Sequence, residues 1–425
     1  MRDHETADIT EAITAQSTET MRTAWSKFLT PWWQASLAVL PIFLITRVFL
    51  LILTHFGGVL FALPNASSFA LDSRTVLYSW YHWDAPRYLS IAGQGYEDAS
   101  YTGLFPLYPV IVHLVYAVTH IDLLVCGLFV SNIAFFGALV LLYRLSMADF
   151  SAEESRRGIL YLAIFPTALI FFEATAISLL LFWTLLCVYL LRQGNWWLAA
   201  VGGAMAALTD LSGALLFILF LCEFWRQCGT RFRQAWKERN GADLGFLSGS
   251  ACSALLIPLG LGCYAFALSR QFKDALLFFA PQGVVIFVAP WSSLLAALRI
   301  VMGTSWYTYA WIHSAFELGI FISCIAVLLF CVRGTQRMPA SYWPLLVFSG
   351  VLLLYALCLP GQLGGNSSTY DPLPSLQYIV VLLFVIFLQL ARWGRLFWVH
   401  NSYLIVSLPL FAFLVLQLFT SHWAI

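Results

Sequence analysis

The sequence predicts an all-α integral membrane protein that crosses a bilayer about 10 to 12 times. Of its 425 residues, 61% are hydrophobic and only 10% are charged, whereas a soluble domain carries roughly 25% charged residues. Its apolar residues also gather in runs near the length of about 20 that a membrane-crossing helix needs. Inside lipid a helix satisfies its own backbone hydrogen bonds, so these runs should form a helical bundle.

The chain should comprise a short tail and one multi-span domain. Segment 1–30 is polar and lacks the apolar core of a cleavable signal peptide, so we expect a disordered cytoplasmic tail. Residues 31–425 should form a single transmembrane domain. The expected spans are 36–56, 105–120, 122–145, 158–173, 175–191, 196–222, 247–268, 311–332, 341–359, 373–391 and 396–420. The apolar stretch 275–303 is broken by prolines and should lie along the interface instead of crossing it.

Basic loops predict the orientation of the bundle. Segment 226–239 carries the densest group of Arg and Lys and should be cytoplasmic, together with the shorter basic loops near Arg333 and Arg392. Loops 57–104 and 360–372 carry few basic residues and should face the opposite side.

One loop conflicts with this alternation. Arg156 and Arg157 indicate that 146–157 is cytoplasmic, but counting the expected spans places it outside. Either one span is missing from the count, or Pro166 and Asp210 mark short, broken helices.

The composition also disfavours several kinds of partner and cofactor. A formal charge of +1 and the lack of a basic tail argue against nucleic-acid binding. Nine cysteines are scattered, mostly within apolar runs and without a CxxC pair, so neither disulfides nor structural zinc are expected. No pattern of acidic residues implies a catalytic metal, and no cofactor is expected.

The most informative stretch is the first loop. It reads WYHWDAPRYLSIAGQGY from Trp80 to Tyr96, followed by LFPLYP from Leu104 to Pro109. Pro86 suits the first turn of a short amphipathic helix. Asp84, placed among aromatic residues, could cap this helix or act as a base whose pKa suits proton abstraction, and these two roles are compatible.

These motifs resemble the first-loop signature of the GPI mannosyltransferase II (PIG-V-like) family, which are GT-C type membrane glycosyltransferases. The resemblance covers about 30 residues strongly and most of the chain weakly. It implies a GT-C-like bundle with an exoplasmic amphipathic first loop over 57–104 and a second exoplasmic amphipathic segment over 270–303. It also implies a polyprenyl-phosphate sugar donor, most simply mannose, a glycolipid or glycan acceptor, and inverting transfer within a membrane.

The resemblance assigns Asp84 as the catalytic residue, the general base or the group that orients the acceptor. Arg87 is a candidate contact for the donor phosphate, or else a salt-bridge partner of Asp84. Around them, His82, Trp83 and Tyr88 are expected to bind the substrates. Tyr378, in the last exoplasmic segment, is a further candidate for substrate binding.

Three positions depart from the family pattern. Ile177 stands where the family has Glu, although Glu173 could replace it from one helical turn away. Asp210 stands where the family has Arg, and it needs a partner such as Arg47, Arg299 or water. Gln377 stands where an Arg commonly precedes the Tyr. Glu173, Asp210 and Gln377 are still expected to contact the substrate.

These departures leave alternatives to an active mannosyltransferase. One is a catalytically altered family member with a binding or scaffold role. Another is a lipid or solute transporter that uses its intramembrane carboxylates. The compact loops favour a bacterial plasma membrane, with the endoplasmic reticulum as the alternative.

Overall fold

The computed structural model is an almost entirely helical bundle, and it describes residues 30–58, 77–279, 287–334, 336–359, 361–363 and 369–417. The expected tail lies outside these residues, except for Thr30. Within these described ranges, seven helices are long and apolar enough to cross a membrane, and the bent pair α15–α16 would make an eighth. The helices α4, α7 and α8 are apolar but shorter. The predicted all-α membrane fold is therefore confirmed.

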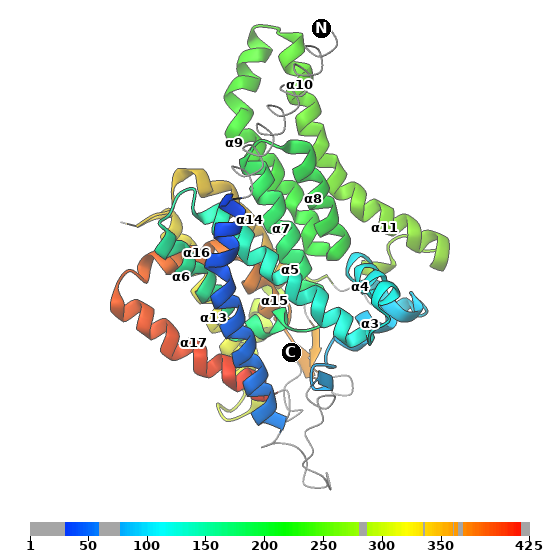
Figure 1. The fold of residues 1–425 in the computed structure, drawn as a ribbon, viewed down its shortest axis with the longest axis vertical. Helices are drawn as coiled ribbons and strands as arrows, with labels where there is room; N and C mark the ends of the chain where they lie inside the picture. Colours follow the sequence, from blue (N-terminus) through cyan, green and yellow to red (C-terminus); the bar gives the residue numbers. More distant parts are fainter. Residues whose placement is uncertain are drawn as a thin grey trace, which may run out of the picture.

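The elements follow one another along the chain as Figure 1 shows. Up to Asp210 they are the helix Thr30–Gly58, α3 (Ala85–Gln94), η1 (Ala99–Gly103), α4 (Leu107–Thr119), α5 (Leu123–Ser146), α6 (Ala152–Ala163), η2 (Pro166–Phe171), α7 (Ile177–Arg192) and α8 (Trp196–Thr209). Then come η3 (Leu211–Leu215), α9 (Leu216–Lys237), α10 (Gly241–Cys252), η4 (Ser253–Leu255), α11 (Leu256–Phe272), η5 (Leu277–Phe279), α12 (Pro290–Gly303) and α13 (Tyr309–Val332). The last are η6 (Ala340–Tyr342), α14 (Trp343–Leu357), α15 (Leu376–Leu382), α16 (Phe384–Trp393), α17 (Phe397–Gln417) and an antiparallel pair of short strands, β1 (Gly361–Leu363) and β2 (Thr369–Asp371).

Ionic contacts join several loops at one end of the bundle, which we call the basic face. Glu154, in α6, lies 2.8 Å from Arg395, and Arg157 donates to the carbonyl of Ala391 at 3.0 Å. Arg192, at the end of α7, lies 3.9 Å from Asp149 in loop 146–157 and 3.4 Å from Glu223 in α9. Loop 146–157 therefore lies on the same face as the basic loops after α9 and α16, which agrees with its own Arg residues.

The helix α4 does not cross the bundle, although an apolar span was expected at 105–120. Tyr108, near its start, bonds to Ser131 at 2.9 Å, and Thr119, at its end, lies 3.7 Å from Cys126, so both ends of α4 lie beside the first nine residues of α5. The residues at both of its ends lie beside the first loop. Tyr78 donates to Asp122, just beyond the end of α4, at 2.9 Å, and Phe105 lies close to its start.

The segment expected as one span at 196–222 is instead two helices that reverse direction at Asp210. The 3-10 turn η3 folds back tightly on α8, and a Cβ on Gly213 would lie 2.2 Å from the backbone of Ala206. The broken-helix interpretation is thus confirmed at Asp210. It is also confirmed at Pro166, which begins η2 after α6 has ended.

The corrections at α4 and at Asp210 have opposite effects on the number of expected spans. The predicted crossing at α4 is absent, and a crossing is gained because α8 and α9 are separate. Together they move loop 146–157 and the loop after α7 to the basic face, and they leave the loops after α9 on their predicted sides. The helices α9 and α10 extend from that face, beyond the rest of the bundle, at the top of Figure 1.

An aromatic part of the core lies between the helix Thr30–Gly58, α5 and η2. The rings of Phe135 and Phe171 stack with centroids 4.3 Å apart. Arg47, only 8% exposed, lies over Phe43, Phe135 and Phe172 at 4.6–5.7 Å. These cation–π contacts stabilise its charge inside the bundle. Arg47 is therefore not the partner that Asp210 was expected to need.

Candidate active site

The helix α3 presents the first-loop residues to the bundle. Pro86 occupies its first turn, as predicted, and the chain turns at Trp83, which has a φ of 53°. Tyr88, Ile91 and Ala92 form its buried face and are each no more than 6% exposed. Because this apolar face packs inward, α3 is fixed with Asp84 at the edge of the bundle.

Asp84 does not cap α3. It occupies the N-cap position, but its side chain accepts no capping hydrogen bond. The interpretation of Asp84 as a helix cap is therefore wrong. Its carboxylate remains available to another group, and its nearest described cation is Arg87, 3.4 Å away.

A cavity of about 260 Å³ lies where α3, η1, η3, α14 and α15 meet, and we call it the acidic cavity. Its polar lining consists of two carboxylates, three tyrosines and three hydroxyl side chains. These residues are Asp84, Asp210, Tyr88, Tyr355, Tyr378, Thr175, Ser212 and Ser375. Leucines, isoleucines, Phe105 and Phe278 form the remaining walls. The described lining contains no Lys, Arg or His.

The surroundings of Asp84 suit a base. The side chain is 39% exposed, but the protein on either side keeps most bulk water away. This desolvation raises the pKa of Asp84, while the charge of Arg87 opposes the rise. Burial also raises the pKa of the Tyr88 hydroxyl, and the charges of Asp84 and Asp210 add to this effect. Tyr88 is thus within electrostatic reach of both carboxylates.

Asp210 is held by the turn that it begins. It accepts hydrogen bonds from the backbone N–H of Ser212 at 2.8 Å and from its hydroxyl at 2.5 Å, both at Oδ1. No described cation pairs with it. The sequence predicted that the Asp210 carboxylate needs a partner. This partner is the hydroxyl of Ser212, two residues away, and not an Arg.

The remaining predicted residues lie at different depths. Arg87 and His82 are exposed beside the cavity, and the His82 ring lies 6.4 Å from that of Trp83. Glu173 is 1% exposed and close enough to Asp84 for their charges to interact. Gln377 is buried beside Thr167 and does not line the cavity. The geometry thus brings together Asp84, Tyr88, Asp210 and Tyr378.

Sequence reasoning missed Thr175 and Tyr355. The Thr175 hydroxyl is buried and finds no hydrogen-bond partner among the described residues. Its backbone carbonyl accepts from Ser131 at 3.2 Å, and Ser131 also bonds to Tyr108 at 2.9 Å. Thr175 is a polar residue between two apolar segments of the sequence, and this position was a signal by which it could be selected. Tyr355 lies within an apolar span and offered none.

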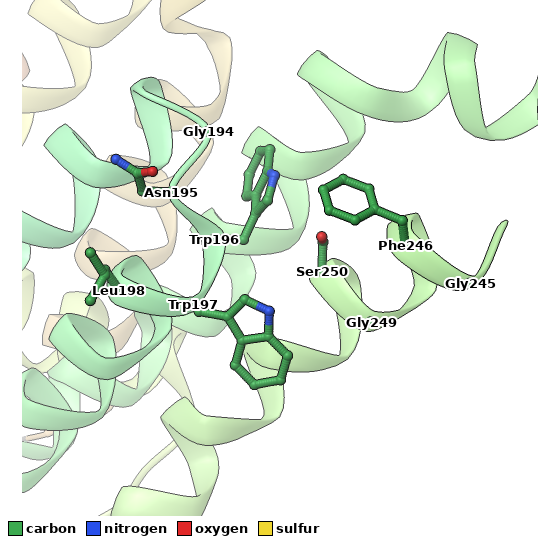
Figure 2. Close-up of a pocket in the computed structure, with 9 residues that line it drawn as sticks. All are labelled: Gly194, Asn195, Trp196, Trp197, Leu198, Gly245, Phe246, Gly249 and Ser250. Carbon is green, nitrogen blue, oxygen red and sulfur yellow. The ribbon is translucent and has the colours of Figure 1, made fainter. Parts of the chain in front are cut away.

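A second cavity, of about 370 Å³, lies at the opposite end of α8, between its first residues and α10 (Figure 2). Its lining consists of Gly194, Asn195, Trp196, Trp197, Leu198, Gly245, Phe246, Gly249 and Ser250. None of these side chains titrates near neutral pH. This cavity therefore lacks the groups needed for acid–base chemistry.

Comparisons with known proteins found distant structural likenesses. No family model and no curated protein matches the chain. ArnT from Cupriavidus metallidurans bound to undecaprenyl phosphate is 12% identical, with a TM-score of 0.46, over 82% of this chain and 75% of that one. The Archaeoglobus fulgidus oligosaccharyltransferase in complex with Zn and sulfate is 13% identical, with a TM-score of 0.42, over 88% of this chain. The present chain spans about half of that protein, 53%.

Proposed function

We propose that the chain is a membrane glycosyltransferase of GT-C type. It transfers a sugar, with inversion, from a polyprenyl-phosphate donor to a hydroxyl of a glycolipid or glycan acceptor. The observation that carries this proposal is the position of Asp84. This carboxylate does not cap its helix, has a raised pKa, and shares one cavity with Tyr88, Asp210 and Tyr378.

The chemistry of such a transfer needs few groups. Ionised Asp84 takes the proton of the acceptor hydroxyl as its oxygen attacks the anomeric carbon from the side opposite the phosphate. The bond from that carbon to the phosphate oxygen breaks, and the polyprenyl phosphate leaves with the electron pair. Arg87, beside Asp84 but outside the cavity lining, is the described cation best placed to meet this phosphate.

The orientation of the bundle supports an exoplasmic site. The acidic cavity lies at the end of α8 that carries Asp210, and the basic face lies at the end near Arg192. By the positive-inside rule the basic face should be cytoplasmic, and this supports an exoplasmic position for the cavity. Three further parts of this proposal come from the sequence: mannose as the sugar rests on the first-loop resemblance, a bacterial plasma membrane on the compact loops, and a reaction without metal on the pattern of acidic residues.

The test is transfer of labelled sugar by the purified protein in liposomes that contain polyprenyl-phosphate mannose and a glycolipid acceptor. We expect Asp84→Asn to lower the turnover rate by about 10²–10⁴-fold, the usual contribution of a general base. Asp98→Asn changes an exposed carboxylate of the same loop and should leave the rate unchanged. An Asp84→Asn variant as active as the wild type would refute the assignment. A wild type that binds such donors without turnover would favour the non-catalytic alternative.

A further inference from the structure

The acidic cavity has an unusual balance of charge for a site that meets a phosphorylated lipid. Its described lining holds the carboxyl groups of Asp84 and Asp210 but no cation. A phosphate placed inside would be repelled by these carboxylates at short range, where the screening by water is weak. A positive group would instead be attracted. This balance disfavours a phosphate in the interior and favours a cation there.

The inner wall of the cavity offers hydrogen-bond acceptors that its own residues do not use. Both bonds from Ser212 reach Oδ1 of Asp210, and no described residue donates to Oδ2. Thr175 Oγ1 is buried, lines the same cavity and has no partner in the described part of the chain. A buried hydroxyl without a partner costs free energy, so a ligand that bonds to Thr175 would recover that cost.

An ammonium group fits these acceptors better than a neutral hydroxyl does. It carries three N–H donors and a positive charge, while Asp210 and Thr175 supply a carboxylate and a hydroxyl. Charge-assisted bonds are roughly twice as strong as neutral ones. The rings of Tyr88 and Tyr378 add the flat surfaces on which a sugar can lie.

Building on the proposed function, we infer that Asp210 and Thr175 form a subsite for the protonated amine of an amino sugar. The amine can belong to the sugar of the donor or to that of the acceptor, since both must approach Asp84. N-acetylation removes the charge and adds bulk, so an N-acetylated sugar should be excluded. A neutral hexose should bind weakly.

Binding is measured first, because it does not require turnover. The full-length protein in detergent is titrated with glucosamine, N-acetylglucosamine and glucose, with thermal stabilisation and calorimetry as readouts. Glucosamine should bind at least tenfold more tightly than the other two. Asp210→Asn should remove this preference, and Thr175→Val, which keeps the side-chain volume, should weaken it severalfold. Asp243→Asn, in an exposed ion pair on α10, is the matched control and should keep the preference.

Several outcomes would overturn the inference. These are equal binding of glucosamine and N-acetylglucosamine, an unchanged preference in Asp210→Asn, or sugar binding that requires Mn²⁺ and disappears with EDTA. The last result would make a metal ion the cation in the cavity. Amine-selective binding without any sugar transfer would instead contradict the proposed function alone.

Turnover then separates the two sources of the amine. One reaction pairs a polyprenyl-phosphate amino sugar with a neutral acceptor, and the other pairs a neutral donor with an amino-sugar acceptor. The reaction that Asp210→Asn slows more identifies the substrate that carries the amine. Transfer between a neutral donor and a neutral acceptor could be as fast as transfer that involves an amino sugar, and unaffected by Asp210→Asn. This result would refute the subsite and leave the glycosyltransferase proposal intact.

Discussion

Arg87 Nη1 lies 3.4 Å from Asp84 Oδ1, and the two residues are three positions apart on one face of α3. Both side chains are partly exposed, at 55% and 39%. An ion pair this open contributes little to stability, less than about 1 kcal/mol. Its importance is electrostatic, because the guanidinium favours the ionised form of Asp84 that a base requires.

Removing the charge of Arg87 should change the pH dependence of transfer. Burial raises the pKa of Asp84 and Arg87 lowers it, so Arg87→Gln should raise this pKa further. Because only ionised Asp84 accepts a proton, the acidic limb of the kcat/KM profile should move to higher pH. Arg87→Lys keeps the charge and should leave the limb near its original position. Superimposable pH profiles for Arg87→Gln and the wild type would show that Arg87 does not influence the ionisation of Asp84.

The turn at Gly213 should tolerate no side chain. A Cβ there would approach the backbone of Ala206 to 2.2 Å, so Gly213→Ala must displace η3 from α8. We expect a loss of about 1–3 kcal/mol in the free energy of unfolding, together with weaker substrate binding because Asp210 begins this turn. Gly245→Ala is the control, since a Cβ there meets nothing within 4 Å. Thermal unfolding in detergent measures both variants, and equal midpoints would contradict the contact.

The ionic cluster on the basic face should be sensitive to the loss of one charge. Glu223, whose side chain is 3% exposed, bonds to Arg226 at 2.5 Å and lies 3.4 Å from Arg192. Glu223→Gln leaves two cations without their shared carboxylate and should cost about 3 kcal/mol of stability. The KM for the donor should not change, because this cluster lies on the opposite face from the acidic cavity. Asp243→Asn, in an exposed pair, should cost less than about 1 kcal/mol.

Cysteine labelling should place loop 146–157 on the side opposite the first loop. Met147 and Asp98 are both exposed, so Met147→Cys and Asp98→Cys are suitable positions. A membrane-impermeant maleimide added to intact cells should label Asp98→Cys only, and Met147→Cys should react after the membrane is permeabilised. The parent protein, with its nine native cysteines, provides the background. Labelling of both variants in intact cells would contradict the assignment of α4 as a helix that does not cross.

The sequence predicted the class of fold and the first-loop helix after Asp84 better than it predicted the path of the chain. Hydropathy identified apolar runs, but it does not distinguish a crossing helix from one such as α4 that lies beside the first loop. A Tyr78–Asp122 hydrogen bond over 44 positions has no local signature. The same limit applies at Asp210, where a polar residue in an apolar run marked an anomaly but not a reversal.

The candidate site was predicted in part for a related reason. Asp84 and Tyr88 share one short helix, so a local motif was sufficient to pair them. Asp210 and Tyr378 reach the same cavity only through tertiary packing, and their selection depended on the family pattern. Gln377 is adjacent in sequence to Tyr378, yet the helical rotation between consecutive residues turns its side chain into the core. The roles assigned to these residues stay predictions.

The small volume of the acidic cavity bears on how long its substrates can be. At about 260 Å³ it is smaller than the roughly 300–1,000 Å³ of typical sites for drug-sized ligands. Only a terminal sugar can enter, and the rest of each substrate must extend into water or lipid. The cavity therefore does not discriminate between substrates by the length of their chains. Short soluble analogues of the donor and acceptor should be selected by the same features of their end groups as the natural long chains.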